Sequence, residues 1–66
     1  MALIKDELVR WNLRIIDLEQ LIAEQKRRVA SEQGEARRSR LEVALQSMQQ
    51  TLQSWRAHKR ALERRL

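Results

Sequence analysis

Mostly apolar side chains recur along this chain at alternating steps of four and three residues, in two separate runs. Steps of this kind place side chains on one face of an α-helix and are typical of a helix packed against another helix. The first run comprises Ile4, Leu8, Trp11, Ile15, Leu18, Ile22, Gln25 and Val29, and the second comprises Leu41, Leu45, Met48, Leu52, Trp55, Lys59, Leu62 and Leu66. Together these positions form what we term the seam.

The two runs are out of phase around the only glycine, Gly34. From Val29 to Leu41 the chain advances 12 positions, which rotates the apolar face of a continuous helix by about 120°. A straight helix would therefore turn its two apolar halves in different directions, whereas a chain bent near Gly34 packs them together. The pattern predicts an all-α fold, an antiparallel helical hairpin (a two-helix coiled coil) in a single domain, residues 1–66.

The expected boundaries follow from the runs and from the glycine. We expect a first helix over about residues 3–31, a turn over about residues 33–36 and a second helix over about residues 38–65. Gly34 is placed to adopt the left-handed conformation that ends many helices. The second helix has two candidate starts, just after Gly34 or at Ser39, since Ser39-Arg40-Leu41-Glu42 fits the capping box.

Folding about Gly34 predicts an antiparallel register in which the numbers of facing residues sum to about 66. This register brings Trp11 beside Trp55 and Gln25 beside Leu41. The other layers pair Ile4 with Leu62, Ile15 with Leu52, Leu18 with Met48, and Ile22 with Leu45. Because both tryptophans lie on the seam, we interpret them as core residues rather than as exposed platforms for stacking nucleobases.

A chain of 66 residues builds a small core, which rarely supplies more than about 3–5 kcal/mol without a further constraint. There is no cysteine for a disulfide, and the single histidine, His58, gives no zinc-site spacing. Self-association is the remaining constraint, and we expect a homodimer in which two hairpins pack into a four-helix bundle. A domain-swapped dimer with the same seam contacts is the open alternative.

A second stripe without charges lies opposite the seam on each helix. It comprises Val9, Leu13, Ile16, Gln20 and Ala23 in the first helix, and Val43, Gln46, Gln50, Gln53 and Ala57 in the second. Val9, Leu13 and Ile16 would be exposed on an isolated hairpin, and such apolar strips usually mark an interface, although single surface apolar residues are also tolerated. Leu21, together with Ala44, widens one side of the seam. We therefore predict an oligomer or partner interface at Val9, Leu13, Ile16 and Leu21.

The chain carries a net charge of +5, with arginine far more frequent than lysine. A positive charge carried mainly by arginine favours binding to nucleic acid or to an acidic protein partner. A genomic base composition that replaces lysine with arginine gives the same excess of arginine without functional meaning. Arg56, Arg60 and Arg64 lie at steps of four along one ridge of the second helix, with Lys59 beside them. A ridge of this kind can neutralise several phosphates. Three acidic residues of the first helix are expected to offset part of it: Asp6, Glu7 and Asp17.

Enzymatic chemistry is not supported by the available side chains. One histidine, four serines and no cysteine or tyrosine provide no nucleophile and base at a meaningful spacing. We therefore expect no catalytic residue, metal, cofactor or small-molecule substrate. No run of apolar residues is long enough to cross a membrane and the first residues do not form a secretory signal, so we expect a cytoplasmic protein. Acids and bases are balanced over residues 1–18, which disfavours a membrane-surface helix.

The segments on either side of Gly34 carry a recurring pattern of residues. They read Ile22-Ala23-Glu24-Gln25-Lys26-Arg27-Arg28-Val29-Ala30 before it and Leu52-Gln53-Ser54-Trp55-Arg56-Ala57-His58-Lys59-Arg60-Ala61-Leu62 after it. In this pattern the chain resembles a group of short, uncharacterised alpha-proteobacterial proteins. The pattern of that group is I-A-x-Q-x-x-x-I, then a glycine turn, then a second helix that ends in L-x-x-H/W-x-x-H-R-x-x-L. The resemblance covers about residues 16–62, but the turn is shorter here and lacks their Asp-Gly-His-Asp-like loop. It implies a bacterial helical hairpin and no particular activity.

The sequence favours a small non-enzymatic interaction or assembly module, which acts through homo-oligomerisation or by docking to a partner protein. The alternative is a basic accessory protein that binds nucleic acid, RNA above all, through the ridge of Arg56, Lys59, Arg60 and Arg64. The two predictions differ in the surface that each requires to be exposed.

Overall fold

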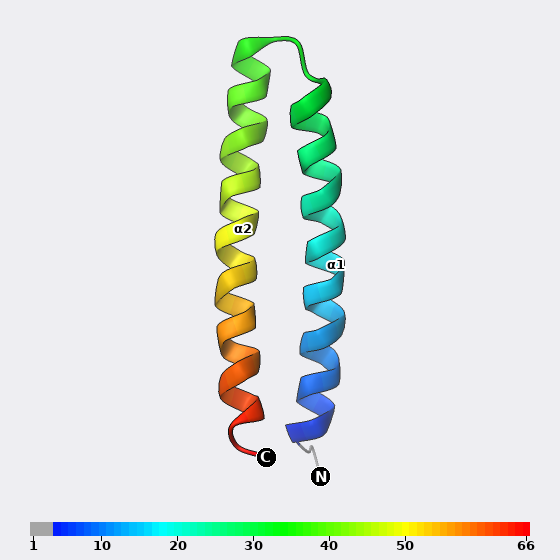
Figure 1. The fold of residues 1–66 in the computed structure, drawn as a ribbon, viewed down its shortest axis with the longest axis vertical. Helices are drawn as coiled ribbons and strands as arrows, with labels where there is room; N and C mark the ends of the chain where they lie inside the picture. Colours follow the sequence, from blue (N-terminus) through cyan, green and yellow to red (C-terminus); the bar gives the residue numbers. More distant parts are fainter. Residues whose placement is uncertain (1–3) are drawn as a thin grey trace.

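The computed structural model describes residues 4–66, which form two helices and no strand. Helix α1 spans Ile4–Ser31 and helix α2 spans Glu35–Glu63. They lie side by side and antiparallel, so that the start of α1 and the end of α2 are at the same end of the molecule (Figure 1). The hairpin measures 51 × 15 × 14 Å. The predicted all-α helical hairpin is confirmed.

The buried face of each helix coincides with the predicted seam. Its least exposed side chains are Ile15, Leu18, Ile22, Gln25, Leu52 and Leu62. The other seam positions that the structure describes are half-buried, with the exception of Leu66. Leu66 is 65% exposed, because α2 ends at Glu63 and the last residues leave the helical path. Its assignment to the seam is wrong.

Two contacts between the helices establish the register. The indole rings of Trp11 and Trp55 have centroids 5.8 Å apart, and Gln25 Nε2 donates a hydrogen bond of 3.0 Å to the carbonyl oxygen of Leu41. Both pairs have numbers that sum to 66, as predicted. The core between them consists of Ile15, Leu18, Ile22 and Leu52, with Leu45, Met48 and Trp55 packed against it.

The connection between the helices differs from the predicted turn. Residues 32–34 link α1 to α2. This helix begins directly after Gly34, at the first of the two candidate starts, rather than near residue 38. The backbone of Gly34 is extended, with φ −82° and ψ 123°, so the prediction of a left-handed glycine is wrong. An extended residue just before a helix is the usual geometry of an N-cap. Ser39 lies within α2 and does not cap it.

Gly34 acts as the N-cap of α2 without a side chain of its own, and no side-chain hydrogen bond caps this helix. The backbone N–H of Gly34 donates a hydrogen bond to Glu32 Oε1 at 3.1 Å. The carbonyl oxygen of Gly34 accepts the first helical hydrogen bond, from the Arg38 N–H at 2.9 Å. The turn is therefore closed by Glu32 and by the start of α2 itself.

The core of the hairpin is thin. Within residues 4–66, no side chain is less than 2% exposed, and the best-buried apolar residue, Leu62, retains 4% of its surface. Two helices can cover each other on one face only, so each seam residue keeps an open flank. Most of the outward surface of both helices is consequently available to other molecules.

Candidate interaction surfaces

Three of the four large apolar side chains that are exposed on α1 lie on its side away from α2. Val9, Leu13 and Ile16 are 57%, 58% and 48% exposed. At ~100° per residue they point within about 60° of one another and roughly opposite the seam. We term these three side chains the outer strip. The structure therefore brings together three of the four residues predicted to form an interface.

Leu21, the fourth predicted interface residue, lies apart from the outer strip. It is 49% exposed but lies about 120° around α1 from Val9, on a flank of the seam. The residues one and two turns away from it on that flank are charged, namely Arg14, Asp17, Glu24 and Arg28. Leu21 is thus an isolated apolar residue among charges and does not extend the strip.

An aromatic cluster surrounds Trp11. The Trp55 ring makes a T-shaped contact with it, with an interplanar angle of 71°, and the His58 ring is tilted by 52° to it, with centroids 4.6 Å apart. Arg14 Cζ lies 5.1 Å from the Trp11 ring centroid, a cation–π contact that contributes about 0.5–1 kcal/mol at an exposed site. Sequence reasoning found the tryptophan pair but missed His58 and Arg14, because side-chain rotamers decide those contacts. The indoles are engaged within the hairpin, which supports their interpretation as core residues.

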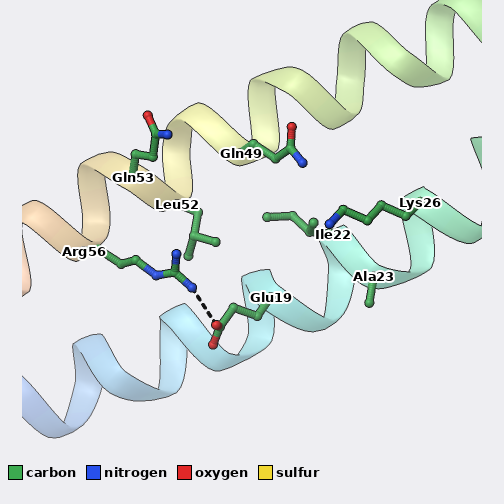
Figure 2. A pocket seen from close by; sticks show the side chains of 8 residues that line it. All are labelled: Glu19, Ile22, Ala23, Lys26, Gln49, Leu52, Gln53 and Arg56. Atoms are coloured by element: carbon green, nitrogen blue, oxygen red, sulfur yellow. Dashed lines mark hydrogen bonds and ion pairs between the residues drawn. The ribbon is translucent and has the colours of Figure 1, made fainter.

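The predicted basic ridge is partly used by contacts within the molecule. Arg56 Nη2 lies 2.7 Å from Glu19 Oε2, across the two helices (Figure 2). Lys59 is half-buried at the seam. Arg60 and Arg64 are exposed, and Arg64 follows the last residue of α2. The four residues therefore do not form one continuous row of exposed cations without ion-pair partners.

Glu19 is the acidic partner that sequence reasoning missed. The acids expected to offset the ridge were Asp6, Glu7 and Asp17, and none of them pairs with it among the residues that the structure describes. Glu19 is not at the level of Arg56 in the register of facing residues. The long side chain of Arg56 reaches it along the flank of the seam. A register that pairs residues by their numbers does not account for the length of a side chain.

Beside the ion pair, the two helices leave an open groove of about 470 Å³, which is lined by Glu19, Ile22, Ala23, Lys26, Gln49, Leu52, Gln53 and Arg56. Ile22 and Leu52 point toward one another between the helices, and Gln49 and Gln53 come from α2 (Figure 2). A second hollow of about 730 Å³ shares Glu19, Gln53 and Arg56 and extends toward Glu63. Within the described residues, no buried side-chain nitrogen or oxygen lacks a hydrogen-bond partner. The groove is thus open and of mixed charge, with Glu19, Lys26 and Arg56 among its lining residues.

Two properties of the described residues concern metal binding and membrane insertion. Residues 4–66 contain no group of three or more histidine or acidic side chains that could hold a metal ion. Neither α1 nor α2 combines the length and the apolar character that a membrane-spanning helix requires.

No protein-family model, curated protein or solved structure matches the chain. The resemblance to short alpha-proteobacterial proteins therefore stays a prediction. Function has to be inferred from the surfaces of the hairpin itself.

Proposed function

We propose that this chain is a small, non-enzymatic assembly module that self-associates through the outer strip of α1. The exposure of Val9, Leu13 and Ile16 on successive turns carries this proposal, because each leaves about half or more of its surface in solvent. Scattered single apolar residues are common on protein surfaces, whereas a contiguous strip usually marks an interface.

The energetics of the hairpin support the same proposal. A core of this size supplies about 3–5 kcal/mol. Full burial of one valine, leucine or isoleucine side chain contributes about 1.5–3 kcal/mol. Covering the outer strip in each of two molecules would therefore add stabilisation comparable to that of the core itself. Since the chain has no cysteine, we place this assembly in the reducing cytoplasm.

The positions of the basic residues give less support to the nucleic-acid alternative. Arg56 is exposed but paired with Glu19, and Lys59 is half-buried. Among the described residues this leaves Arg60 and Arg64 as the ridge cations that are both exposed and outside an ion pair. Two cations neutralise few phosphates, and affinity for nucleic acid rises with the number neutralised.

Light scattering of the wild-type chain over a wide range of concentrations tests the proposal. We expect a dimer that dissociates on dilution, and a Val9→Lys variant that keeps its helical circular dichroism but is monomeric. Val43→Lys is the matched control, because Val43 is 67% exposed on α2, outside the outer strip, and its replacement should leave the dimer intact.

A wild-type chain that is monomeric at every concentration would overturn the proposal. If Val9→Lys unfolds the hairpin without dissociating it, the assignment of the buried and outer faces is reversed. A monomer that is retained on immobilised RNA at low salt and released as salt rises would support nucleic-acid binding instead.

A further inference from the structure

We infer that two copies of this chain pack their outer strips against each other in antiparallel orientation, with Leu13 at the two-fold axis. The inference rests on the proposed self-association and names its geometry. Because the outer strip lies roughly opposite the seam, the four helices of such a dimer form a row, in the order α2, α1, α1, α2, rather than a square bundle.

The residues around Leu13 are complementary to a second copy of themselves. Val9 lies one turn before Leu13 and Ile16 one turn after it, while Arg10 and Asp17 border the same side of the outer strip. If a second α1 runs in the opposite direction with Leu13 facing Leu13, Val9 of each copy meets Ile16 of the other. The same operation brings Arg10 of each copy beside Asp17 of the other. Such a self-complementary patch is what a two-fold interface requires.

The charges of Arg10 and Asp17 are not paired with each other within one chain. The two residues are separated by about 10 Å along α1, and neither has an ion-pair partner among the described residues. The two ion pairs found among residues 4–66, Arg38–Glu42 and Arg56–Glu19, lie elsewhere. Opposite charges that meet across an interface favour one orientation over others. Here they favour the antiparallel one.

Arg27 argues against a parallel pairing of the same strips. It follows Val9 by 18 positions, so at ~100° per residue it points in the same direction from α1. Parallel packing would place Arg27 of each copy against Arg27 of the other, an unfavourable like-charge contact. Antiparallel packing about Leu13 instead places the two Arg27 side chains at opposite ends of the interface, far from each other.

The flank that contains Leu21 argues against a square bundle. In a square bundle the two hairpins would meet through flanks of their seams, and Leu21 would become central. Its neighbours there are charged residues one and two turns away, and burying them would require their desolvation. The outer strip contains no such charge.

Disulfide trapping in this cysteine-free chain tests the geometry. A disulfide needs Cα atoms within about 4.4–6.8 Å of each other. With Leu13 at the axis, Leu13→Cys should form a covalent dimer under mild oxidation. Two Val9→Cys sites would be offset by about 12 Å along the helices, so that variant should stay uncrosslinked. A mixture of Val9→Cys and Ile16→Cys chains should give the mixed disulfide.

Charge exchange provides a second test that leaves the apolar contacts intact. Arg10→Asp and Asp17→Arg should each weaken the dimer about 2- to 30-fold, because each removes two symmetry-related ion pairs. The double variant should restore the wild-type dissociation constant. Arg27→Gln is the matched control, and in the antiparallel dimer it should leave that constant unchanged.

The outcomes separate this inference from the proposed function. A monomeric wild-type chain would overturn both. A dimer in which Val9→Cys, Leu13→Cys and Ile16→Cys all crosslink to themselves would be parallel, and would overturn the inference alone. A dimer that crosslinks only through Leu21→Cys would be a square bundle, and would also overturn the inference alone. A dimer that none of these sites traps would overturn the inference as well.

Discussion

The indole rings of Trp11 and Trp55 form a T-shaped pair, with centroids 5.8 Å apart and an interplanar angle of 71°. The edge of an indole is electropositive and its face electronegative, so this arrangement is favourable beyond the area that it buries. The contact joins residues far apart in the sequence and exists only because the chain reverses at residues 32–34. It is therefore a direct reporter of the hairpin.

A double-mutant cycle on this pair should reveal its coupling. Trp11→Leu and Trp55→Leu each remove the edge-to-face contact, and the double variant should be more stable than the sum of the two losses implies, by about 0.5–1.5 kcal/mol. Urea unfolding monitored by circular dichroism measures the three variants. Because the pair lies within one molecule, the coupling should not depend on protein concentration. A coupling that grows with concentration would indicate that the helices are exchanged between chains.

Leu18 and Leu13 should respond very differently to the same substitution. Leu18 is 7% exposed and Leu13 58%, so Leu18→Ala leaves a cavity in the core whereas Leu13→Ala removes a solvated side chain. We expect Leu18→Ala to cost about 2–5 kcal/mol, which is enough to unfold so small a domain. Leu13→Ala should change the free energy of unfolding by less than about 0.5 kcal/mol when it is measured in the monomeric Val9→Lys background. Equal losses would contradict the assignment of the two faces.

Gln25 should be replaceable by leucine at little cost to stability. It is 5% exposed and its hydrogen bond to the Leu41 carbonyl contributes about 0.5–1.5 kcal/mol net. That carbonyl lies inside α2, where the backbone N–H of residue 45 is its usual helical partner, so it is not left unsatisfied. Apolar burial in Gln25→Leu then offsets the lost bond, whereas Gln25→Ala also leaves a cavity and should be less stable than Gln25→Leu. Denaturant unfolding of both variants measures this difference. If Gln25→Leu is as damaging as Leu18→Ala, the hydrogen bond contributes far more than this account allows.

The seam could be predicted from the sequence because burial on one helix face requires apolar residues at a fixed spacing. One glycine between two out-of-phase runs was then sufficient to predict the register, and Trp11–Trp55 and Gln25–Leu41 confirm it. The exposure of the outer strip followed from the same reasoning, since a residue opposite the seam of a two-helix hairpin has nothing to cover it. These features depend on backbone periodicity alone.

The features that sequence reasoning missed depend on side-chain conformation or on local backbone choice. The Arg56–Glu19 pair is off the register because a guanidinium can reach along the seam. His58 meets Trp11 from the flank of α2 through the orientation of its ring. Leu66 matches the spacing of the seam in the sequence, but α2 ends before it. At Gly34, the absence of a side chain permits several backbone conformations, and composition alone did not distinguish an N-cap from a left-handed end.

The extended backbone of Gly34 predicts that a serine at this position stabilises the protein, whereas a left-handed Gly34 would predict the opposite. A serine here could accept a hydrogen bond from the free N–H groups at the start of α2, which no side chain caps in the structure. An added Cβ would meet only Glu32 Oε1, at 3.3 Å. That atom is the end of a half-buried side chain, which has to shift by a few tenths of an ångström. Replacing glycine also lowers the entropy of the unfolded chain. Gly34→Ser should therefore raise stability by about 0.5–1 kcal/mol.

Thermal unfolding at one fixed protein concentration measures this effect, since dimerisation makes the melting temperature depend on concentration. For a domain of this size the gain corresponds to a rise in Tm of about 2–8 °C. Gly34→Ala is the matched control: it lowers the entropy of the unfolded chain in the same way but has no oxygen to cap the helix, so its Tm should fall below that of Gly34→Ser. If both variants melt well below the wild type, Gly34 occupies a left-handed conformation in solution, because a Cβ is unfavourable there by about 1–2 kcal/mol.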